Sequence, residues 1–296
     1  MENEQQYLSA LKEVYNEGEL RHTRNGLTKS IFGLKMKFDL QEAFPILTTK
    51  LVPFKTVLRE LLWFISGDTS SKTLEDKGVH IWTKNASKEF LESRGLNFTE
   101  GDLGPVYGFQ WRHIGAKYYS SNSNYTNKGF DQLEDIINTI KEDPTSRRLI
   151  LTAWNPLDLG KMALPPCHMT CQFYVRGAGA YTDATSKYLD CQLYQRSGDM
   201  FLGVPFNISS YAILVHIISH CCSLKPGKLV HIIGDAHIYQ EHASVVEKQL
   251  SRIPYICESK LVIQSDAPKD IDSLKEMHFS LENYKNQGSL KADMIA

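Results

Sequence analysis

Apolar residues recur at the three- and four-residue spacing of a helix in several parts of the chain, and turn-forming residues end most of these stretches. The spacing predicts helices over residues 7–17, 53–66, 130–141, 208–222 and 238–250. Residues 53–66 are apolar on nearly every side, which is typical of a buried helix. Asn207 directly precedes the fourth helix, and we expect its side chain to cap that helix.

Period-two alternation and a high content of β-branched or aromatic residues indicate strands elsewhere. They favour strands over residues 30–40, 149–154, 169–175, 191–196 and 229–233. We expect a long hairpin connection at residues 177–190, constrained loops at 101–112 and 197–206, and a turn at 234–239. Because no internal repeat or linker divides the chain, the sequence predicts a single α+β domain over residues 1–296. A large mixed or antiparallel β-sheet packed by helices would form it.

Composition and charge exclude some classes of protein. The formal net charge of -1 and the 42% hydrophobic content argue against a protein that holds nucleic acid by charge alone. No secretory signal is visible at the start, and no apolar run approaches the roughly 20 residues of a membrane helix. The six dispersed cysteines are expected to be reduced thiols. We therefore expect a cytoplasmic or nuclear protein with no metal site and no membrane contact.

Cys167 follows two prolines, in the stretch Leu-Pro-Pro-Cys-His at residues 164–168. The prolines stiffen the backbone before the thiol, and a predicted strand begins directly after it. A thiol held in this way suits a nucleophile, but free cysteines are also common in cores, so both interpretations stay open here. A hydrolase that uses Cys167 and His168 is disfavoured, because adjacent strand residues face opposite sides of a sheet.

Charged residues in unusual positions are the other candidates. Glu60 lies in the middle of the apolar helix predicted at 53–66, while Arg59 points elsewhere. Such a carboxylate is either part of a buried ion pair or has a raised pKa, which suits a general acid or base. Arg24 lies in a basic turn, and Arg147 with Arg148 precedes a strand. These arginines are compatible with phosphate binding or with simple solvation.

Several longer motifs carry a resemblance to a known family, in that family's order and over nearly the whole chain. They are Glu-Leu-Leu-Trp-Phe at 60–64, Gly-Asp-Leu-Gly-Pro-Val-Tyr-Gly-Phe-Gln-Trp-Arg-His at 101–113, the Cys167 motif at 164–168, Cys-Gln-Leu-Tyr-Gln-Arg-Ser-Gly-Asp at 191–199, Gly-Val-Pro-Phe-Asn at 203–207 and Gly-Asp-Ala-His-Ile-Tyr at 234–239. On these motifs the sequence resembles the thymidylate synthase family. The resemblance implies reductive methylation of dUMP to dTMP, with methylenetetrahydrofolate as the one-carbon and hydride donor and without a metal. It also implies a homodimer formed through a face of the sheet.

The resemblance further implies a role for each matching residue. Cys167 would add to C6 of dUMP as a thiolate, and a cationic surround would lower its pKa. Glu60 would relay protons to the pyrimidine, Tyr107 and His168 would handle the C5 proton, and Asn207 would read the base. The other implied nucleotide contacts are Arg24, Gln195, Arg196, Ser197, Asp199, His237 and Tyr239, with Arg147 and Arg148 reaching across from the other subunit. The implied folate contacts are Lys50, Ile81, Trp82, Asn85, Leu164, Asp199, Leu202, Gly203, Phe206 and Ala296, whose carboxylate would latch a closing C-terminal segment.

Four stretches depart from the family's usual pattern. The loop after Arg24 is one residue shorter, which we expect to alter its closure on phosphate. Leu51 stands where an arginine commonly follows Lys50, which we expect to weaken contact with the folate tail. The 176–190 connection is longer than in many members and is expected to form an external hairpin. Tyr-Lys-Asn-Gln-Gly at 284–288 replaces a Pro-His-Pro element.

Two alternatives of the same fold are a pyrimidine nucleotide hydroxymethylase, which captures water instead of hydride, and a non-catalytic nucleotide- or RNA-binding relative. Asn207 and the C-terminal segment favour the synthase over the hydroxymethylase. The complete set of Cys167, Glu60, Asn207 and Arg196 argues against a purely binding role, because binding needs no nucleophile. RNA binding as a second activity stays open, and a cysteine hydrolase ranks last.

Overall fold

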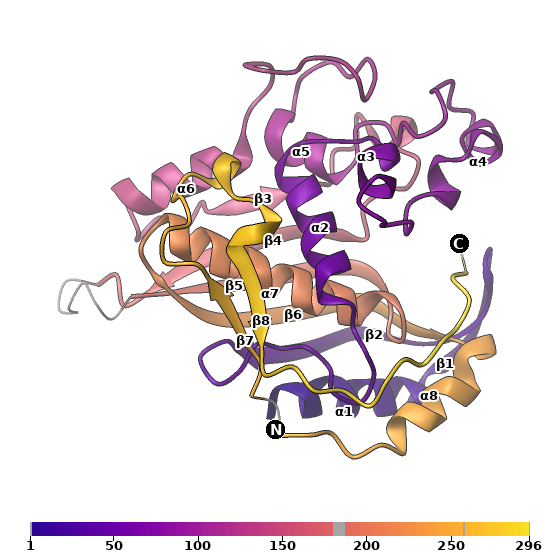
Figure 1. Cartoon of the computed structure of the whole chain (residues 1–296). Coiled ribbons are helices and arrows are strands. Elements are labelled where there is room, and N and C mark those ends of the chain that lie inside the picture. Colours follow the sequence, from indigo (N-terminus) through magenta and orange to yellow (C-terminus); the bar gives the residue numbers. More distant parts are fainter. Residues whose placement is uncertain (1, 180–186, 257, 296) are drawn as a thin grey trace.

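The computed structural model describes residues 2–179, 187–256 and 258–295, and a six-stranded mixed sheet lies at its centre (Figure 1). The strand order is β1-β2-β6-β5-β4-β3, with β5 and β6 parallel and the other neighbours antiparallel. The strands are β1 (Glu19–Thr23), β2 (Gly26–Asp39), β3 (Ile150–Thr152), β4 (His168–Arg176), β5 (Tyr188–Asp199) and β6 (Lys225–Tyr239). A separate antiparallel pair comprises β7 (Lys260–Ile263) and β8 (Phe279–Glu282). The prediction of an α+β fold with a mixed sheet is confirmed.

Helices bury one face of the central sheet. Helix α1 (Glu2–Glu17) packs against β2, and α7 (Gly203–Cys221) packs against β5 and β6. Helix α2 (Phe54–Ile65) contacts α7, which lies beside the β5 and β6 strands in Figure 1. The other helices are α3 (Ser71–Glu75), α4 (Lys88–Ser93), α5 (Tyr107–His113), α6 (Gln132–Glu142) and α8 (Ala243–Leu250). The 3-10 turns are η1 (Lys84–Ala86), η2 (Leu159–Lys161), η4 (Gln240–His242), η5 (Ile271–Ser273) and η6 (Glu276–His278).

The opposite face of the sheet stays open to solvent in this chain. Buried and exposed side chains alternate along β4 and β5, and the exposed set contains Gln172, Tyr174, Gln192 and Tyr194. Tyr174 is 61% exposed and Tyr194 40% exposed. Aromatic side chains on an open sheet face are typical of a surface that binds another protein.

Periodicity predicted the amphipathic elements well. The helices expected at 7–17, 53–66 and 130–141 are confirmed as α1, α2 and α6. On β2 the side chains of Leu34, Met36 and Phe38 are buried and alternate with exposed lysines, as expected. The five cysteines within the described residues are free thiols, and Cys257 lies outside them.

Two predicted loops are partly regular structure. The expected loop at 101–112 is wrong in its second half, because Tyr107–His113 forms α5. Five consecutive residues of this helix are buried, so the sequence lacks the alternation of an apolar and an exposed polar face by which a helix is recognised. Gly108 permits the packing, since a Cβ there would lie 2.8 Å from the carbonyl oxygen of Phe64. The expected loop at 197–206 divides between the end of β5 and the start of α7.

The turn expected at 234–239 is wrong as well, because β6 continues through it to Tyr239. Gly234 lies inside the strand, where a Cβ would come within 2.8 Å of the carbonyl oxygen of Arg196 on β5. Consequently the following helix begins at Ala243 rather than at residue 238. Helix α7 begins at Gly203, so Asn207 lies inside the helix and does not cap it.

The two hairpins also begin and end differently from the prediction. The basic turn expected around Arg24 is mostly strand, because β1 pairs with β2 from Glu19 to Thr23. Strand β5 begins at Tyr188, opposite Arg176, so the connection expected at 177–190 is shorter. Residues 180–186 of the predicted external hairpin lie outside the described residues.

Helix α7 corrects the expectation that no apolar segment approaches the length of a membrane helix. Among the described residues it is the one helix that is long and apolar enough to cross a membrane. However, 78% of its most apolar window is buried inside the protein. Its position against the sheet is that of a core helix.

Glu4 of α1 ties this helix to the loop that follows β2. Its buried carboxylate accepts four hydrogen bonds of 2.6–2.9 Å, from the backbone N–H and hydroxyl groups of Thr48 and Thr49. The same loop later carries Lys50 and leads into α2. Glu4 therefore holds together two segments that are far apart in the sequence.

We expect Glu4→Ala to lower the free energy of unfolding by about 3–5 kcal/mol, because four buried donors lose a charged acceptor. Chemical denaturation followed by circular dichroism measures this change. Glu13→Ala, on the exposed side of the same helix, serves as the control and should change stability by no more than about 0.5 kcal/mol. Equal effects of the two substitutions would contradict the assigned role of Glu4.

Candidate functional site

Cys167 lies where the proline lead-in meets β4, and Arg196 of β5 fixes this junction. The guanidinium of Arg196 donates hydrogen bonds to the carbonyl oxygens of Pro165 at 3.0 Å and Pro166 at 2.9 Å. The same guanidinium lies 3.7 Å from the Cys167 sulfur. Unlike the fully buried Cys171 and Cys191, Cys167 keeps some solvent contact. The geometry is that of a held, accessible nucleophile rather than a core cysteine.

The thiol of Cys167 is not activated by its surroundings in the single chain. Burial raises its pKa above the ordinary value, while the charges of Arg196 and Arg24 act to lower it. The expected cationic surround also includes Arg147 and Arg148 of the other subunit; with Arg196 and Arg24 alone, desolvation outweighs the two guanidiniums. Both arginines nevertheless act in the expected direction.

Tyr107 and His168 form a stacked pair next to Cys167. The Tyr107 hydroxyl accepts a hydrogen bond from the backbone N–H of Cys167 at 2.7 Å. The two rings stack with centroids 4.1 Å apart, and Nδ1 of His168 lies 3.0 Å from the Tyr211 hydroxyl. Burial lowers the pKa of His168 to about 3. An imidazole with so low a pKa is a poor base for a thiol, which further disfavours the hydrolase alternative.

Glu60 points from α2 toward Trp82, whose Nε1 donates a hydrogen bond to Oε1 of Glu60 at 2.8 Å. Burial raises the pKa of Glu60 to about 7, and the bond from Trp82 opposes that rise. Arg59 pairs instead with Glu276 at 2.8 Å. The raised-pKa interpretation is confirmed and the buried ion pair is wrong. The centroids of the Trp82 and Tyr107 rings are also 6.1 Å apart. Trp82 therefore connects Glu60 to the stacked rings of Tyr107 and His168 beside Cys167.

Asn207 faces β5 from the second turn of α7. Its Oδ1 accepts a hydrogen bond from Nε2 of Gln195 at 3.1 Å. Because Asn207 lies inside the helix and does not cap it, its carboxamide is available for a ligand. Gln195 pairs across the strands with His168, so the amide pair lies close to the stacked rings.

The ends of β5 and β6 bring further predicted residues to the same region. Asp199 pairs with His237 in the parallel register, and its Oδ1 accepts hydrogen bonds from the backbone N–H groups of Phe201 and Leu202. Ser197 pairs with Asp235, whose carboxylate lies 3.2 Å from Nδ1 of His237.

Arg24 reaches the same region, whereas two other predicted arginines do not. The charge of Arg24 acts on the pKa of both Cys167 and Tyr239, so it lies near each of them. Arg147 and Arg148 are exposed just before β3, at the edge of the sheet. No contact among the described residues joins them to Cys167.

The predicted folate residues lie in three segments of the chain, around Trp82, before Cys167 and at the start of α7. Asn85 is buried, and its Nδ2 has no hydrogen-bond partner among the described residues. Because buried polar groups almost always have partners, this donor fits a polar ligand at this position. Four further predicted folate residues have half-buried apolar side chains that pack against the core: Ile81, Leu164, Leu202 and Phe206. A Cβ built on Gly203 would lie 3.9 Å from both Asp199 and Asn207, so the folate and base sides adjoin.

Lys50 and Ala296 are two further predicted folate contacts. The ammonium of Lys50 is buried, donates to the Phe201 carbonyl oxygen and lies 3.8 Å above the Phe201 ring. Burial lowers its pKa to about 8. In this arrangement Lys50 contacts protein and is not directed to the surface. Ala296 lies outside the described residues, whereas the carbonyl oxygen of Asp293 is held by Nε2 of His242 at 2.9 Å.

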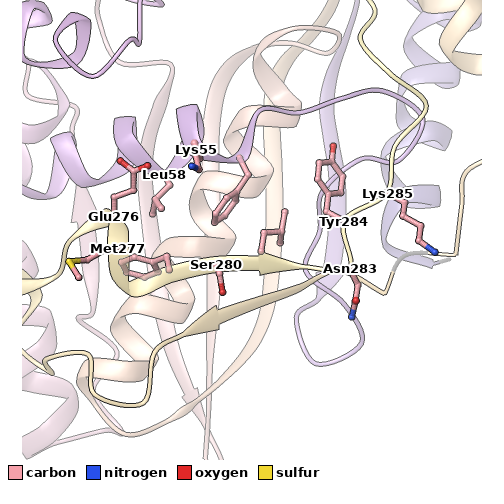
Figure 2. A pocket seen from close by; sticks show the side chains of 11 residues that line it. Lys55, Leu58, Glu276, Met277, Ser280, Asn283, Tyr284 and Lys285 are labelled. Carbon is pink, nitrogen blue, oxygen red and sulfur yellow. The ribbon is translucent and has the colours of Figure 1, made fainter.

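A groove of about 960 Å³ lies away from this cluster, between α2 and β8 (Figure 2). Apolar and charged side chains line it, including Phe54, Lys55, Leu58, Met277 and Tyr284. None of the predicted catalytic side chains belongs to its lining. Among the described residues no group of three or more His, Cys, Asp or Glu side chains could hold a metal ion.

Sequence reasoning missed two residues that support the site, His231 and Tyr211. His231 lies between Leu229 and Ile233 on the core-facing side of β6 and contacts Gln195. A histidine among inward-facing strand positions needs a polar partner, and this was the available signal. Tyr211 lies on the apolar α7, where its sequence position suggests only packing.

Comparison with known proteins agrees with this geometry. The family model described as thymidylate synthase matches residues 5–296. The chain is 49% identical to a thymidylate synthase from Homo sapiens over 98% of this chain and 90% of that protein. It is 48% identical to a thymidylate synthase from Equine herpesvirus 2, over 98% of each. A bifunctional dihydrofolate reductase-thymidylate synthase from Zea mays is 49% identical over 98% of this chain. The chain spans 54% of that longer relative.

Proposed function

The chain belongs to the thymidylate synthase family, and we propose that it converts dUMP to dTMP. The second substrate would be methylenetetrahydrofolate, which would leave as dihydrofolate. The observation that carries the proposal is the fixed position of Cys167 beside Arg196, with Glu60 of pKa about 7 in the same region. A positioned thiol and a carboxyl group that titrates near neutral pH are the two groups that a covalent, proton-relayed reaction requires.

In the proposed reaction the Cys167 thiolate adds to C6 of the uracil ring and makes C5 nucleophilic. Glu60 would move protons at the pyrimidine, and the stacked Tyr107 and His168 would hold the hydrogen-bond network through which the C5 proton leaves. C5 would bond to the methylene carbon of the folate, lose its proton and expel tetrahydrofolate. Hydride transfer from tetrahydrofolate to the resulting exocyclic methylene would then break the C6–S bond and release the thiolate, leaving dTMP and dihydrofolate. Methylenetetrahydrofolate would supply the one-carbon unit and the hydride. Arg24, Arg196 and Ser197 would bind the phosphate, and His237 with Tyr239 would bind the ribose.

The experiment that tests the proposed function follows the absorbance of dihydrofolate formed from methylenetetrahydrofolate in the presence of dUMP. Dihydrofolate formation that requires dUMP supports the synthase. Formation of a hydroxymethyl nucleotide and tetrahydrofolate would instead assign the hydroxymethylase. Nucleotide binding without any product would point to the binding relative, and an RNA-binding assay in parallel would test that role.

We further propose a homodimer in which the open sheet face is the interface. The exposed Tyr174 and Tyr194 support it, because they give this face the aromatic character of a subunit contact. Arg147 and Arg148 lie at the edge of the same sheet and are exposed in the single chain. In a two-fold dimer they would reach the phosphate site of the partner. A cytoplasmic or nuclear location rests on the sequence composition alone, and subcellular fractionation tests it.

A complementation experiment tests the shared site. We expect Arg148→Ala and Cys167→Ala to be nearly inactive when each is expressed alone. Co-expression should restore about a quarter of the native activity, because random pairing makes half of the dimers mixed and each mixed dimer keeps one intact site. Activity of the co-expressed pair that equals the mean of the two variants would contradict an arginine contributed by the partner.

A further inference from the structure

His231 occupies a fully buried position on β6, on the side of the sheet that carries Gln195. Its Nε2 lies 2.9 Å from Oε1 of Gln195, while its Nδ1 has no partner among the described residues. Burial lowers the pKa of His231 to about 3, so the ring is neutral and carries a single N–H. A carbonyl oxygen can only accept a hydrogen bond, so that N–H is on Nε2 and donates to Gln195.

Gln195 is itself buried, and a second contact confirms the orientation of its amide. Its Nε2 donates to the carbonyl oxygen of Ser197 at 2.9 Å and to Oδ1 of Asn207 at 3.1 Å. If the amide flipped, its oxygen would face the Ser197 carbonyl and its amino group would face the N–H of His231. The contact with Ser197 would then be repulsive, and His231 could accept from the flipped amide only as the Nδ1–H tautomer, which would leave a buried N–H without a partner among the described residues. His231 and Ser197 thus hold one orientation of Gln195.

The orientation of the Gln195 amide determines that of the Asn207 amide. Because Gln195 donates to it, Oδ1 of Asn207 faces β5, and its amino group remains as a donor for a ligand. Oδ1 keeps a second lone pair. This arrangement offers one donor and one acceptor side by side. Uracil presents the complementary pair, an acceptor at O4 and a donor at N3, whereas cytosine presents a donor at N4 and an acceptor at N3.

Binding of cytosine would require the opposite orientation of Asn207. The flipped side chain would place its amino group against Nε2 of Gln195, so two donors would face each other in a buried site. Gln195 could respond only by flipping as well, which His231 and Ser197 oppose. Discrimination between the two bases therefore depends on the hydrogen bonds with His231 and Ser197 that fix Gln195, and not on Asn207 alone.

We propose that His231 is a positioning residue that selects uracil over cytosine by fixing the amide of Gln195 and, through it, that of Asn207. The inference rests on the proposed function, because it assumes that a pyrimidine nucleotide binds at Asn207. His231 touches no substrate in this role. It acts through two amides, and the quantity it controls is the ratio of the affinities for dUMP and dCMP.

The test measures the dissociation constants of dUMP and dCMP by equilibrium dialysis, together with kcat and KM for dUMP. We expect His231→Leu, which removes the donor, to lower the preference for dUMP over dCMP by about tenfold to a hundredfold. His231→Gln can place a donor near the position of Nε2, and it should keep the preference within about threefold of native. His216→Leu is the matched control, because Nδ1 of His216 donates within its own helix α7, to the Ala212 carbonyl oxygen. It should leave the ratio unchanged.

Thermal denaturation shows whether each variant is folded. An unchanged preference in folded His231→Leu would overturn the inference. If that variant does not fold, nitrogen-15 NMR of the native protein decides, because the inference requires the Nε2–H tautomer of His231. Observation of the Nδ1–H tautomer would overturn it. Native protein that binds neither nucleotide would contradict the proposed function, whereas dUMP binding combined with an unchanged preference contradicts only the role of His231.

Discussion

Replacement of Cys167 by alanine is expected to lower dUMP-dependent dihydrofolate formation by at least about 10⁴-fold, because the variant has no nucleophile to add to C6. Binding of dUMP should change much less, since the proposed nucleotide contacts of Arg196, Asn207, His237 and Tyr239 remain. The measurement is the absorbance assay for turnover, with equilibrium dialysis for binding. A large loss of kcat with a nearly unchanged dissociation constant is the expected signature.

Cys222 provides the control for this substitution, because it is also a free cysteine with partial solvent contact. It lies at the end of α7, where its thiol contacts the Ile137 carbonyl oxygen at 3.8 Å. Cys222→Ala should keep turnover within about twofold of native. Substantial turnover by Cys167→Ala would exclude this thiol as the nucleophile and with it the covalent mechanism.

The state of the Cys167 thiol links the chemistry to the proposed dimer. In the single chain burial holds its pKa above the ordinary value in spite of Arg196 and Arg24. A partner subunit that contributed Arg147 and Arg148 would add two positive charges to the same phosphate site. These charges would act to lower the pKa of Cys167, as the first two already do. Completion of the site by the partner would thus also favour the reactive thiolate.

Much of the chemistry was predictable from local sequence because it depends on local environment. Two prolines stiffen the approach to Cys167, and the apolar helix around Glu60 desolvates its carboxylate. Both effects act over a few residues, so a pattern in the sequence reveals them. The alternating face of β2 was equally visible, since its period follows directly from burial on one side of a sheet.

The remaining features depend on contacts between distant segments. Gly108 and Gly234 read as loop residues, but each lies in a regular element because a backbone oxygen of another segment approaches it closely. The net pKa of Cys167 is a balance between burial and two arginines, and no sequence pattern gives the outcome of such a balance. The contact of His231 with Gln195 exists only because β6 lies beside β5, so the sequence position of His231 does not reveal it.

Glu60→Gln is expected to lower kcat by about 10²- to 10⁴-fold, because the amide keeps the hydrogen bond from Trp82 but cannot relay a proton. The pH profile of kcat/KM reports the groups of the free protein. Native protein should therefore show a transition near pH 7, where the pKa of Glu60 lies. The profile of the variant should lack this transition. A control with Glu142→Gln, an exposed residue of α6, should keep both the rate and the transition.

The same carboxyl group predicts how stability depends on pH. The pKa of Glu60 rises from an ordinary value of 4.5 to about 7 in the folded protein. Below pH 4.5 the group is protonated in both states, and between 4.5 and 7 only the unfolded chain is ionised. Folding stability from this group therefore falls as pH rises through that window, and it levels off above pH 7.

The shift corresponds to at most about 3 kcal/mol, and the partial solvent contact of Glu60 reduces it. Glu60→Gln has no charge to desolvate, so its melting temperature relative to native should increase between pH 4.5 and pH 8. Thermal denaturation of both proteins across this range measures the difference. If the difference did not change with pH, Glu60 would not carry the raised pKa on which its role as a proton relay depends. The burial that raises the pKa of Glu60 for proton exchange near neutral pH is therefore the same burial that lowers the stability of the folded protein there.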